Sequence, residues 1–203
     1  MAHDSDTARP VRHGSRGRAR RDEILSVALG VIAENGYRGL TLGEVAKRVG
    51  LSQQGVLHYF PSKEELLIGV LRQRDEWDVS APFGGENAVE FTVGDLEMLV
   101  EVNAARPEIV RTFSALLGES ITEEHPAGPY FKDRYDWVRD SIESTLRGEF
   151  GETMPSGITA AQGAIMLTAL MDGLQYQWLH DPEKIDMPEL FHGLTRLVTG
   201  RES

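Results

Sequence analysis

Residues 41–67 read TLGEVAKRVGLSQQGVLHYFPSKEELL, and this stretch decides the fold. Thr-Leu-Gly-Glu at 41–44 has the spacing of a capping box, in which the threonine caps a helix and the glutamate bonds back. That helix should be short, because Gly50 favours the left-handed conformation that ends a helix. Ser52 can cap a second short helix, which should stop before the following proline. The stretch therefore predicts two short helices joined by the turn 49–52, the pattern of a helix-turn-helix unit.

Apolar residues recur at helical spacing on both sides of this unit. Residues 22–35 form an amphipathic pattern that Gly36 ends, and residues 62–65 (Ser-Lys-Glu-Glu) are a second capping box that opens a longer helix. After loop signals at 80–90, further helical patterns follow at about 92–105, 107–117, 131–146, 158–180 and 187–199. No alternating strand pattern persists, so the sequence predicts an all-α protein of about nine helices.

The charges are divided unevenly along the chain. The 203 residues carry 21 Lys and Arg against 32 Asp and Glu, a formal net charge of −11. Residues 1–63 hold ten Lys and Arg against six Asp and Glu, whereas residues 64–203 hold eleven against twenty-six. Six arginines and no acid lie between Arg9 and Arg21. A basic front of this kind suits a polyanionic partner, and an acidic body keeps the protein in solution.

The sequence argues against catalysis and metal binding. There is no cysteine, which excludes disulfides, thiolate metal sites and a cysteine nucleophile. The motifs G-x-S-x-G, G-x-G-x-x-G and H-E-x-x-H and the phosphate-binding P-loop are absent. The six histidines show no three- or four-residue spacing that would place two of them on one helix face. We therefore expect no enzymatic activity and no cofactor.

The sequence also argues against membrane insertion and export. The longest charge-free run, residues 153–171, contains a proline, two glycines and several other polar residues. A membrane span needs about 20 predominantly apolar residues. No apolar run of the kind found in a secretory signal accompanies the N-terminal arginines. We therefore expect a cytoplasmic protein without a membrane partner.

Several linked features resemble the tetracycline-repressor (TetR) family. Residues 52–67 match its recognition helix and following turn, including the Tyr-Phe pair and the Ser-Lys-Glu helix start. Thr-Leu-x-x-Val-Ala from Thr41 and Asn-Gly-Tyr at 35–37 match as well, and the resemblance covers about fifty residues, a quarter of the chain. It implies three parts, which are a flexible Arg-rich arm at 1–19, a helix-turn-helix DNA-binding domain at 20–66 and a C-terminal helical ligand-binding and dimerisation domain at 67–203.

The resemblance also implies roles for individual residues of the first two parts. The recognition helix should lie in the major groove of double-stranded DNA, where glutamine amides can pair with adenine. The expected base-reading residues are Gln53 and Gln54, and His58 is expected to reach a base or a phosphate. The expected backbone contacts, which fix register without reading sequence, are Thr41, Ser52, Tyr59 and Lys63. Arg18 and Arg20 are expected to contact the DNA from the arm. Leu57 departs from the family pattern, which often has tyrosine there, and Leu57 and Phe60 are expected to be core residues.

For the C-terminal domain the resemblance implies a pocket and a dimer interface. Candidate ligand contacts are the aromatic, soft or polar residues Met98, Asn103, Phe113, Trp137, Met171, Gln175 and Trp178; His125 and Asp172 are further polar candidates. Small and apolar residues of the last two helices would pair with their copies across a two-fold axis as a four-helix bundle. These are Ile165, Ala169, Leu170, Leu174, Leu190, Leu194 and Leu197.

The expected function is transcriptional regulation by a homodimeric repressor that a small-molecule effector releases from a palindromic operator. Two alternatives remain open. One is a DNA-binding regulator whose C-terminal domain is filled and takes no effector. The other is a helical ligand-binding module that has lost specific DNA recognition. Activation instead of repression is also open, because the sequence does not place the operator relative to a promoter.

Overall fold

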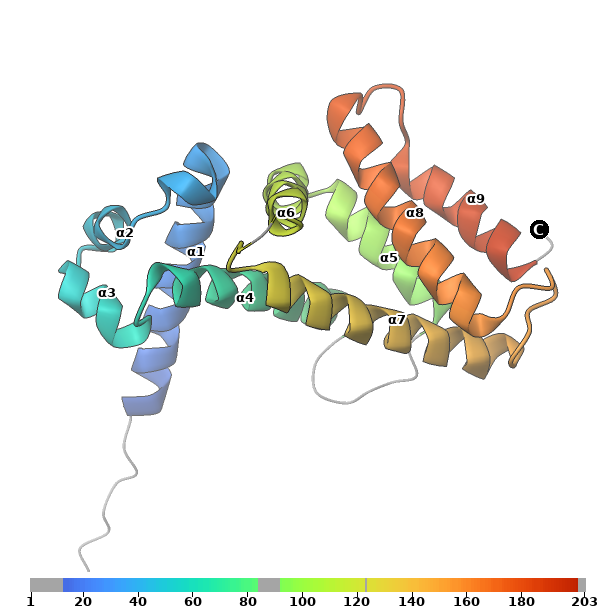
Figure 1. Cartoon of the computed structure of the whole chain (residues 1–203), viewed down its shortest axis with the longest axis horizontal. Coiled ribbons are helices and arrows are strands. Elements are labelled where there is room, and N and C mark those ends of the chain that lie inside the picture. The colour runs from blue at the N-terminus through green and yellow to red at the C-terminus, as the bar shows by residue number, and fades with distance from the viewer. Residues whose placement is uncertain (1–12, 84–91, 123, 201–203) are drawn as a thin grey trace, which may run out of the picture.

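The computed structural model describes residues 13–83, 92–122 and 124–200, and its regular elements there are all α-helices (Figure 1). They are α1 (His13–Gly39), α2 (Leu42–Val49), α3 (Gln53–Tyr59), α4 (Lys63–Phe83), α5 (Val93–Ala104), α6 (Pro107–Ser120), α7 (Gly128–Phe150), α8 (Ala160–His180) and α9 (Met187–Thr199). The predicted all-α class is confirmed. The predicted loop at 80–90 begins too early, because residues 80–83 belong to α4, and the rest of it lies outside the described residues. No helix of the described ranges has the length and apolar character needed to cross a bilayer.

Helix α1 is longer at its start than the sequence pattern suggested. It begins at His13, inside the segment 1–19 that was expected to be a flexible arm. Arginine and alanine are good helix formers, so an Arg-rich stretch can continue a helix without an apolar face. The predicted break at Gly36 is present as a non-helical residue with φ 67° and ψ 176°. Arg9 and Arg12 lie outside the described residues.

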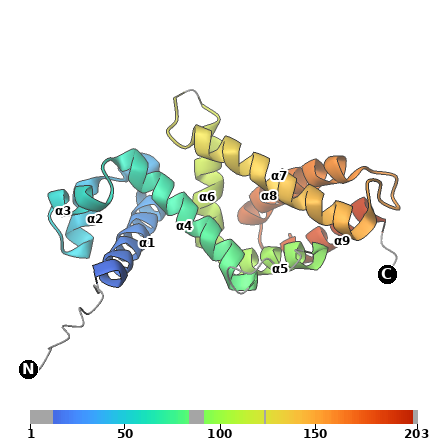
Figure 2. The same ribbon diagram turned by 90° about the horizontal axis from the view of Figure 1, so that it is seen from below.

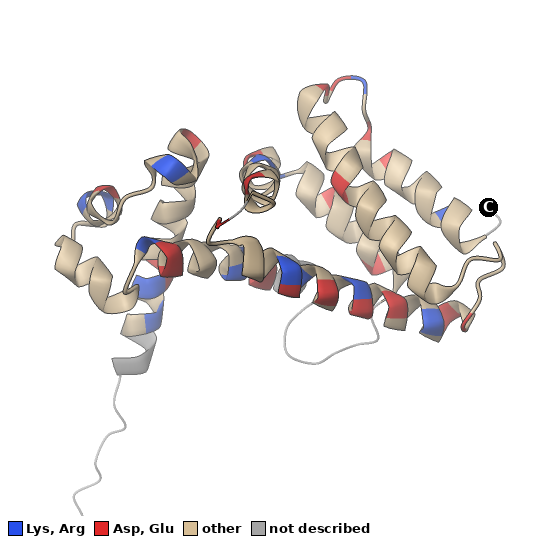
Figure 3. Ribbon diagram, in the orientation of Figure 1, with Lys and Arg blue, Asp and Glu red and all other residues tan. Residues whose placement is uncertain are grey.

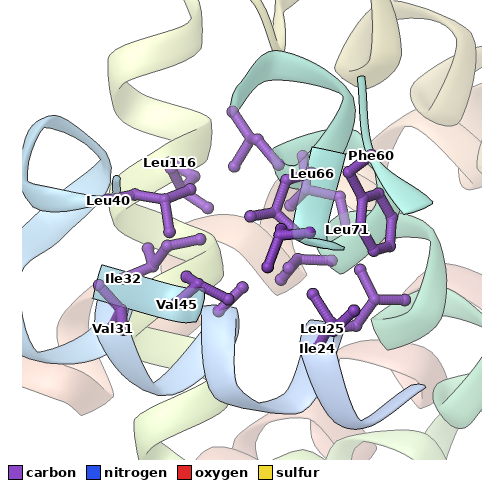
Figure 4. Close-up of a cluster of buried hydrophobic side chains, with 14 of the residues drawn as sticks. Ile24, Leu25, Val31, Ile32, Leu40, Val45, Phe60, Leu66, Leu71 and Leu116 are labelled. Carbon is purple, nitrogen blue, oxygen red and sulfur yellow. The ribbon is translucent and has the colours of Figure 1, made fainter. Parts of the chain in front are cut away.

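The helices α1 to α3 form an N-terminal head whose apolar core is shared with the rest of the chain. Ile24 and Leu25 of α1 and Leu66 of α4 are fully buried in it. Leu116 of α6 and Phe131 of α7 are buried in the same cluster, and Figure 4 shows Leu116 beside the side chains of the head. The expected domain boundary at 66/67 therefore falls inside α4, and the head has no separate core of its own.

The remaining helices form a C-terminal body around a second buried cluster. Leu146 of α7, Leu167 of α8 and Phe191 of α9 are almost wholly buried in it. Helix α7 packs along α8 (Figure 2), α8 packs against α9, and α9 also packs against α5. Thr159 and Gln162 form a capping box at the start of α8, since each side chain accepts the backbone N–H of the other residue. Helix α6 lies between the head and this body (Figure 1).

Removing a side chain that joins the two parts should destabilise the protein strongly. Leu116 is 2% exposed, so Leu116→Ala leaves a cavity in the shared core and should lower the free energy of unfolding by about 2–5 kcal/mol. Ile121, one residue beyond the end of α6, is 85% exposed, and Ile121→Ala should stay within about 0.5 kcal/mol of the parent. Urea unfolding at one protein concentration measures both. Equal losses for the two variants would contradict the shared core.

Candidate nucleic-acid interface

The turn between α2 and α3 is set by one glycine and two backbone hydrogen bonds. Gly50 has φ 67° and ψ 35°, the left-handed conformation that residues with a Cβ rarely adopt. The Gly50 N–H donates to the carbonyl of Lys47 at 3.4 Å and the Leu51 N–H to the carbonyl of Ala46 at 2.9 Å, and these bonds close the last turn of α2. Val45 and Val56 are fully buried beneath the turn. The two helices are therefore held at a fixed angle, as the sequence pattern predicted.

Both helices of the unit begin with a hydroxyl cap. Thr41 Oγ1 accepts the N–H of Glu44 at 3.2 Å, and Ser52 Oγ accepts the N–H of Gly55 at 3.1 Å. Both residues are exposed. Each hydroxyl proton remains able to donate outward while the oxygen caps the helix, so each could also bond a phosphate. The caps are confirmed, and the phosphate contacts remain predictions.

Helix α3 presents its polar residues on one side. Gln53, Gln54 and His58 are exposed, whereas Val56 on the opposite side is fully buried. Tyr59 is half-buried against the head core, and its ring lies edge-on to that of His58 with centroids 5.5 Å apart. The exposed amides and imidazole form a continuous polar face. This face can enter a groove and read the edges of bases.

Of the two hydrophobic residues of this segment that were expected in the core, Phe60 is buried there, whereas Leu57 is in neither described core cluster. Phe60 is 2% exposed and belongs to the shared core. Leu57 is half-buried. The prediction that Phe60 belongs to the core is confirmed.

Lys63 stands at the first residue of α4, next to this face. Its ammonium lies 4.1 Å from the centroid of the Tyr37 ring and donates to the carbonyl of Arg38 at 3.4 Å. A cation over an aromatic ring is attracted by the negative face of the ring. The end of α1 therefore sets the position of this predicted phosphate contact.

The arginines of α1 divide into supporting and exposed side chains. Arg20 donates to the carbonyl of Val49 at 2.7 Å and to Glu23 at 2.6 Å, which ties α1 to the last turn of α2. The guanidinium of Arg21 lies 4.9 Å from the centroid of the Phe60 ring. Arg18 is exposed. The predicted DNA contact of Arg20 thus competes with two bonds inside the head, whereas the contact predicted for the exposed Arg18 stays a prediction.

Carboxylates neutralise part of the positive charge of the head. Arg48 donates to both oxygens of Glu34, at 2.9 and 2.7 Å, and to Glu44 at 2.8 Å. The hydrogen bonds from Arg48 hold the pKa of the Glu34 carboxyl below its ordinary value. Figure 3 shows Lys and Arg distributed over α1, α2 and the start of α4, and alternating with acids along α7. The basic character of the head therefore depends on residues other than Arg48, such as the exposed Lys47.

The structure does not bring the predicted ligand residues together around one point. Phe113 is buried in the shared core, whereas Trp178 is buried in the second cluster with Met171 packed against it. Asn103 and Gln175 are buried, and Asn103 accepts a hydrogen bond from Arg106 at 3.3 Å. Met98 and Trp137 are 45% and 53% exposed. Within the part of the chain that the structure describes, these two side chains therefore do not line an interior site.

A partly buried charged cluster beside Phe113, in which Arg74 is 4% exposed, was missed by sequence reasoning. The guanidinium groups of Arg74 and Arg134 lie 4.0 and 4.8 Å from the centroid of the Phe113 ring. Arg134 Nε donates to Asp75 at 2.9 Å, and the Tyr130 hydroxyl donates to the same carboxylate. Arg74 continues the apolar stripe of α4 at helical spacing. A charge on such a stripe is the signal that could have identified the cluster.

A second polar contact extends this cluster to α8. The Tyr135 hydroxyl donates to Asp172, and the Tyr176 hydroxyl donates to the carbonyl of Ser114 at 2.7 Å. Burial raises the pKa of the Asp172 carboxyl, and burial together with the neighbouring carboxylate raises the pKa of Tyr135. Helices α4, α6, α7 and α8 are thus joined by partly buried hydrogen bonds.

The predicted dimerisation residues divide between the surface and the core. Ile165, Leu190 and Leu197 are 56%, 46% and 75% exposed. Ala169 is exposed as well, and Leu170 and Leu194 are half-buried. The prediction that Leu174 lies in the dimer interface is wrong, because this residue is only 7% exposed and packs within the second core of its own chain. The face of α8 that carries Leu174 points inward, which the small-and-apolar pattern did not distinguish.

Two glycine substitutions, one in the turn and one inside α1, should change the stability of the protein in opposite directions. Gly50→Ala forces an alanine into the left-handed conformation and should destabilise the protein by about 1–2 kcal/mol. Gly30 lies inside α1 with no atom within 4 Å of the position of an added Cβ. Gly30→Ala should therefore stabilise the protein by about 0.5–1 kcal/mol. Urea unfolding measures both, and a stabilising Gly50→Ala would contradict the turn.

Comparison with known proteins agrees with this geometry. The family model described as "Bacterial regulatory proteins, tetR family" matches residues 24–70, which span most of α1 to the first half of α4. BetI of Burkholderia thailandensis, an HTH-type transcriptional regulator, is 30% identical over 166 residues, or 79% of this chain and 80% of BetI. RutR of Escherichia coli K12, also an HTH-type transcriptional regulator, is 44% identical over 63 residues, 30% of each chain.

The whole fold has relatives among solved structures. SmeT in complex with triclosan superposes with a TM-score of 0.70 at 20% identity and covers 88% of this chain and 90% of SmeT. At this identity the likeness concerns the fold, and it extends through head and body alike. Head geometry, the match along most of BetI and the match to the family model confirm the resemblance seen in the sequence. The chain belongs to the TetR family of bacterial regulatory proteins and is a transcriptional regulator.

Proposed function

We propose that this regulator is a homodimeric repressor that binds a palindromic operator and is released from it by a small molecule. The observation that carries this proposal is the sharing of one apolar core between the head and α6. Leu116 and Phe131 lie in the same buried cluster as the head residues Ile24 and Leu25. A change in the position of α6 must therefore move the head or break this packing.

Sequence reading is assigned to the exposed side of α3. Gln53, Gln54 and His58 project from it, and their types suit base edges in the major groove. Thr41, Ser52 and Lys63 flank this side and can bond backbone phosphates. Arg18 is placed to add a contact from α1. In this arrangement the phosphate contacts set the register and the glutamines supply the selectivity.

Dimerisation is assigned to the exposed apolar side of α8 and α9. Ile165, Met166, Leu190 and Leu197 are large apolar residues that are 40–75% exposed on these two helices. Apolar side chains gathered on adjacent helices lower their free energy by pairing with a second copy. A two-fold pairing presents two α3 helices to two half-sites of a palindrome, and the two contacts multiply in affinity.

The effector site is assigned to the junction of α4, α6, α7 and α8, beside the partly buried cluster of Arg74, Asp75, Arg134 and Asp172. Two observations support this position. The cluster places the guanidinium groups of Arg74 and Arg134 against the buried ring of Phe113 in α6, and Tyr176 beside it donates to the carbonyl of Ser114 in the same helix. SmeT, which is described as the repressor of a multidrug efflux pump of Stenotrophomonas maltophilia, has been solved with triclosan bound. A molecule that replaced hydrogen bonds within the cluster by hydrogen bonds to itself would shift α6.

Release then follows from linkage between the two sites. An effector that binds better to the DNA-free arrangement of the heads shifts the population toward that arrangement. The same coupling requires DNA to weaken effector binding by the same factor. An activator would use the same structural parts, so the direction of regulation depends on where the operator lies.

Loss of one amide from α3 should reduce sequence selectivity without affecting the fold. Gln54→Ala removes one base-reading group, and we expect about 5–100-fold less discrimination between the preferred duplex and one altered at the contacted base pair. A duplex selected from a random pool by the parent protein serves as the probe, and fluorescence anisotropy measures the affinities. Lys184→Ala, whose side chain is 81% exposed in the α8–α9 connection, is the control. Unchanged discrimination in variants of Gln53, Gln54 and His58 together would contradict base reading by α3.

A charge on the proposed dimer face should separate the protomers. Leu197→Asp places a carboxylate on a 75% exposed position, so the fold should tolerate it while the interface does not. We expect a dimer for the parent and a monomer for the variant in sedimentation equilibrium, with weakened operator binding. Ile121→Asp puts the same charge on an 85% exposed isoleucine away from α8 and α9 and should leave the dimer intact. A dimeric Leu197→Asp would place the interface elsewhere.

A further inference from the structure

Three segments that are far apart in the sequence meet at the ring of Tyr37. Tyr37 lies in the last turn of α1, Lys63 begins α4, and His125 lies in the connection between α6 and α7. The imidazole of His125 approaches the tyrosine ring edge-on, with centroids 5.2 Å apart and planes inclined at 64°. The ammonium of Lys63 lies 4.1 Å from the centroid of the same ring. One ring of the head therefore contacts both a side chain of the body and a predicted phosphate-binding cation.

His125 is held in a single orientation. Its side chain is 10% exposed, and its Nδ1 accepts the N–H of Ala127 at 3.2 Å. A neutral imidazole whose Nδ1 accepts carries its proton on Nε2. Within the described part of the chain this buried Nε2 has no hydrogen-bond partner. The carboxylate of Glu119, in the last turn of α6, lies 3.7 Å away, just beyond hydrogen-bond reach.

The position of His125 therefore depends on the last turn of α6. A shift of a few tenths of an ångström would complete or further open the contact between Nε2 and Glu119. Ala127, two residues beyond His125, is fully buried in the shared core, so the connection cannot move independently of the head. Glu124 has φ 66°, a conformation that is strained for a residue with a Cβ. Strain of this kind is found where a segment is held in place by its surroundings or switches between arrangements.

Lys63 connects the Tyr37 ring to the predicted DNA-contacting face. Lys63 contacts this ring and donates to the carbonyl of Arg38 at 3.4 Å, and its charge also acts on the neighbouring Glu64 carboxylate. Tyr37 is half-buried and packs on the shared core, and burial together with the Glu64 carboxylate raises its pKa. A change in the tilt of this ring moves the surface on which the ammonium rests. Lys63 would then leave the position from which it reaches a phosphate.

We propose that His125 is a positioning residue that fixes Lys63 through the ring of Tyr37 and so reports the position of the last turn of α6 to the DNA-contacting face. The inference rests on the proposed function, because it names a route by which the body regulates a DNA contact. It assigns to the α6–α7 connection a role that packing of the core alone does not require.

The first test needs no DNA. In the full-length protein the ε-methylene protons of Lys63 should show a ring-current shift in the NMR spectrum, because the ammonium lies over Tyr37. His125→Ala should move these signals toward those of Lys184, an exposed lysine, whereas His125→Phe keeps an edge-on ring and should preserve the shift. Tyr37→Leu should remove the shift and also abolish the effect of His125→Ala. Unchanged Lys63 signals in a folded His125→Ala protein would overturn the proposal.

The second test is a double-mutant cycle on operator affinity over a salt series. Lys63→Ala should reduce the salt slope of the dimer by about 1.8, the contribution of one phosphate contact in each of the two half-sites. His125→Ala should reduce the slope by a similar amount, and the double variant should bind no more weakly than Lys63→Ala alone. Additive losses would mean that His125 acts separately from Lys63 and would overturn the proposal. A parent protein that binds no duplex would refute the proposed function. The NMR result alone would then decide whether His125 positions Lys63 through the ring of Tyr37.

Discussion

The structure depends on the insertion of α6 into the apolar core of the head. Phe113 and Leu116 are nearly fully buried in the cluster that contains Leu25 of α1 and Leu66 of α4. Protein interiors are packed as densely as organic crystals and transmit displacement instead of absorbing it. If the head joined the body only through α4, the head would be free to swing about that helix. With α6 inserted, the orientation of the head is set by the packing of the body.

The hydrogen bonds of the charged cluster beside Phe113 help to select the geometry in which these helices pack. Buried charges are costly unless their hydrogen bonds are satisfied, and a satisfied network favours one geometry. Asp75 accepts bonds from Arg134 and Tyr130, and Asp172 accepts one from Tyr135. A molecule that takes over one of these bonds changes which geometry is best satisfied. The same helices carry Glu119 and the connection with His125, so both routes from body to head pass through α6.

The head could be predicted from the sequence because its signals are local. Caps at Thr41 and Ser52 and the left-handed Gly50 each act within a few residues, and each is found where the pattern placed it. The DNA contacts assigned to these residues remain predictions. Arg20 illustrates the limit, since its bond to the Val49 carbonyl joins residues 29 positions apart and leaves no periodic trace. The early start of α1 was missed because an Arg-rich helix has no apolar stripe.

The body was predicted as helices but not as a site. Periodicity tells which residues share a helix face, but it does not tell which neighbour that face meets. Leu174 was therefore assigned to a dimer surface although it packs inside its own chain, and Trp137 was assigned to a pocket although it is 53% exposed. Charged residues on apolar stripes were the more informative signal. Arg74 is 4% exposed, and its burial marks the cluster better than any aromatic residue does.

The measurement that tests the central claim most directly is fluorescence anisotropy of the full-length protein with DNA from upstream of its own gene, against a scrambled duplex, over a salt series. A specific dimeric regulator should bind the upstream DNA saturably, with one or two dimers per site, and should prefer it over the scrambled duplex at every salt concentration. Weak binding that is equal for both duplexes, with only a steep salt dependence, would contradict specific recognition of this DNA by the α3 face.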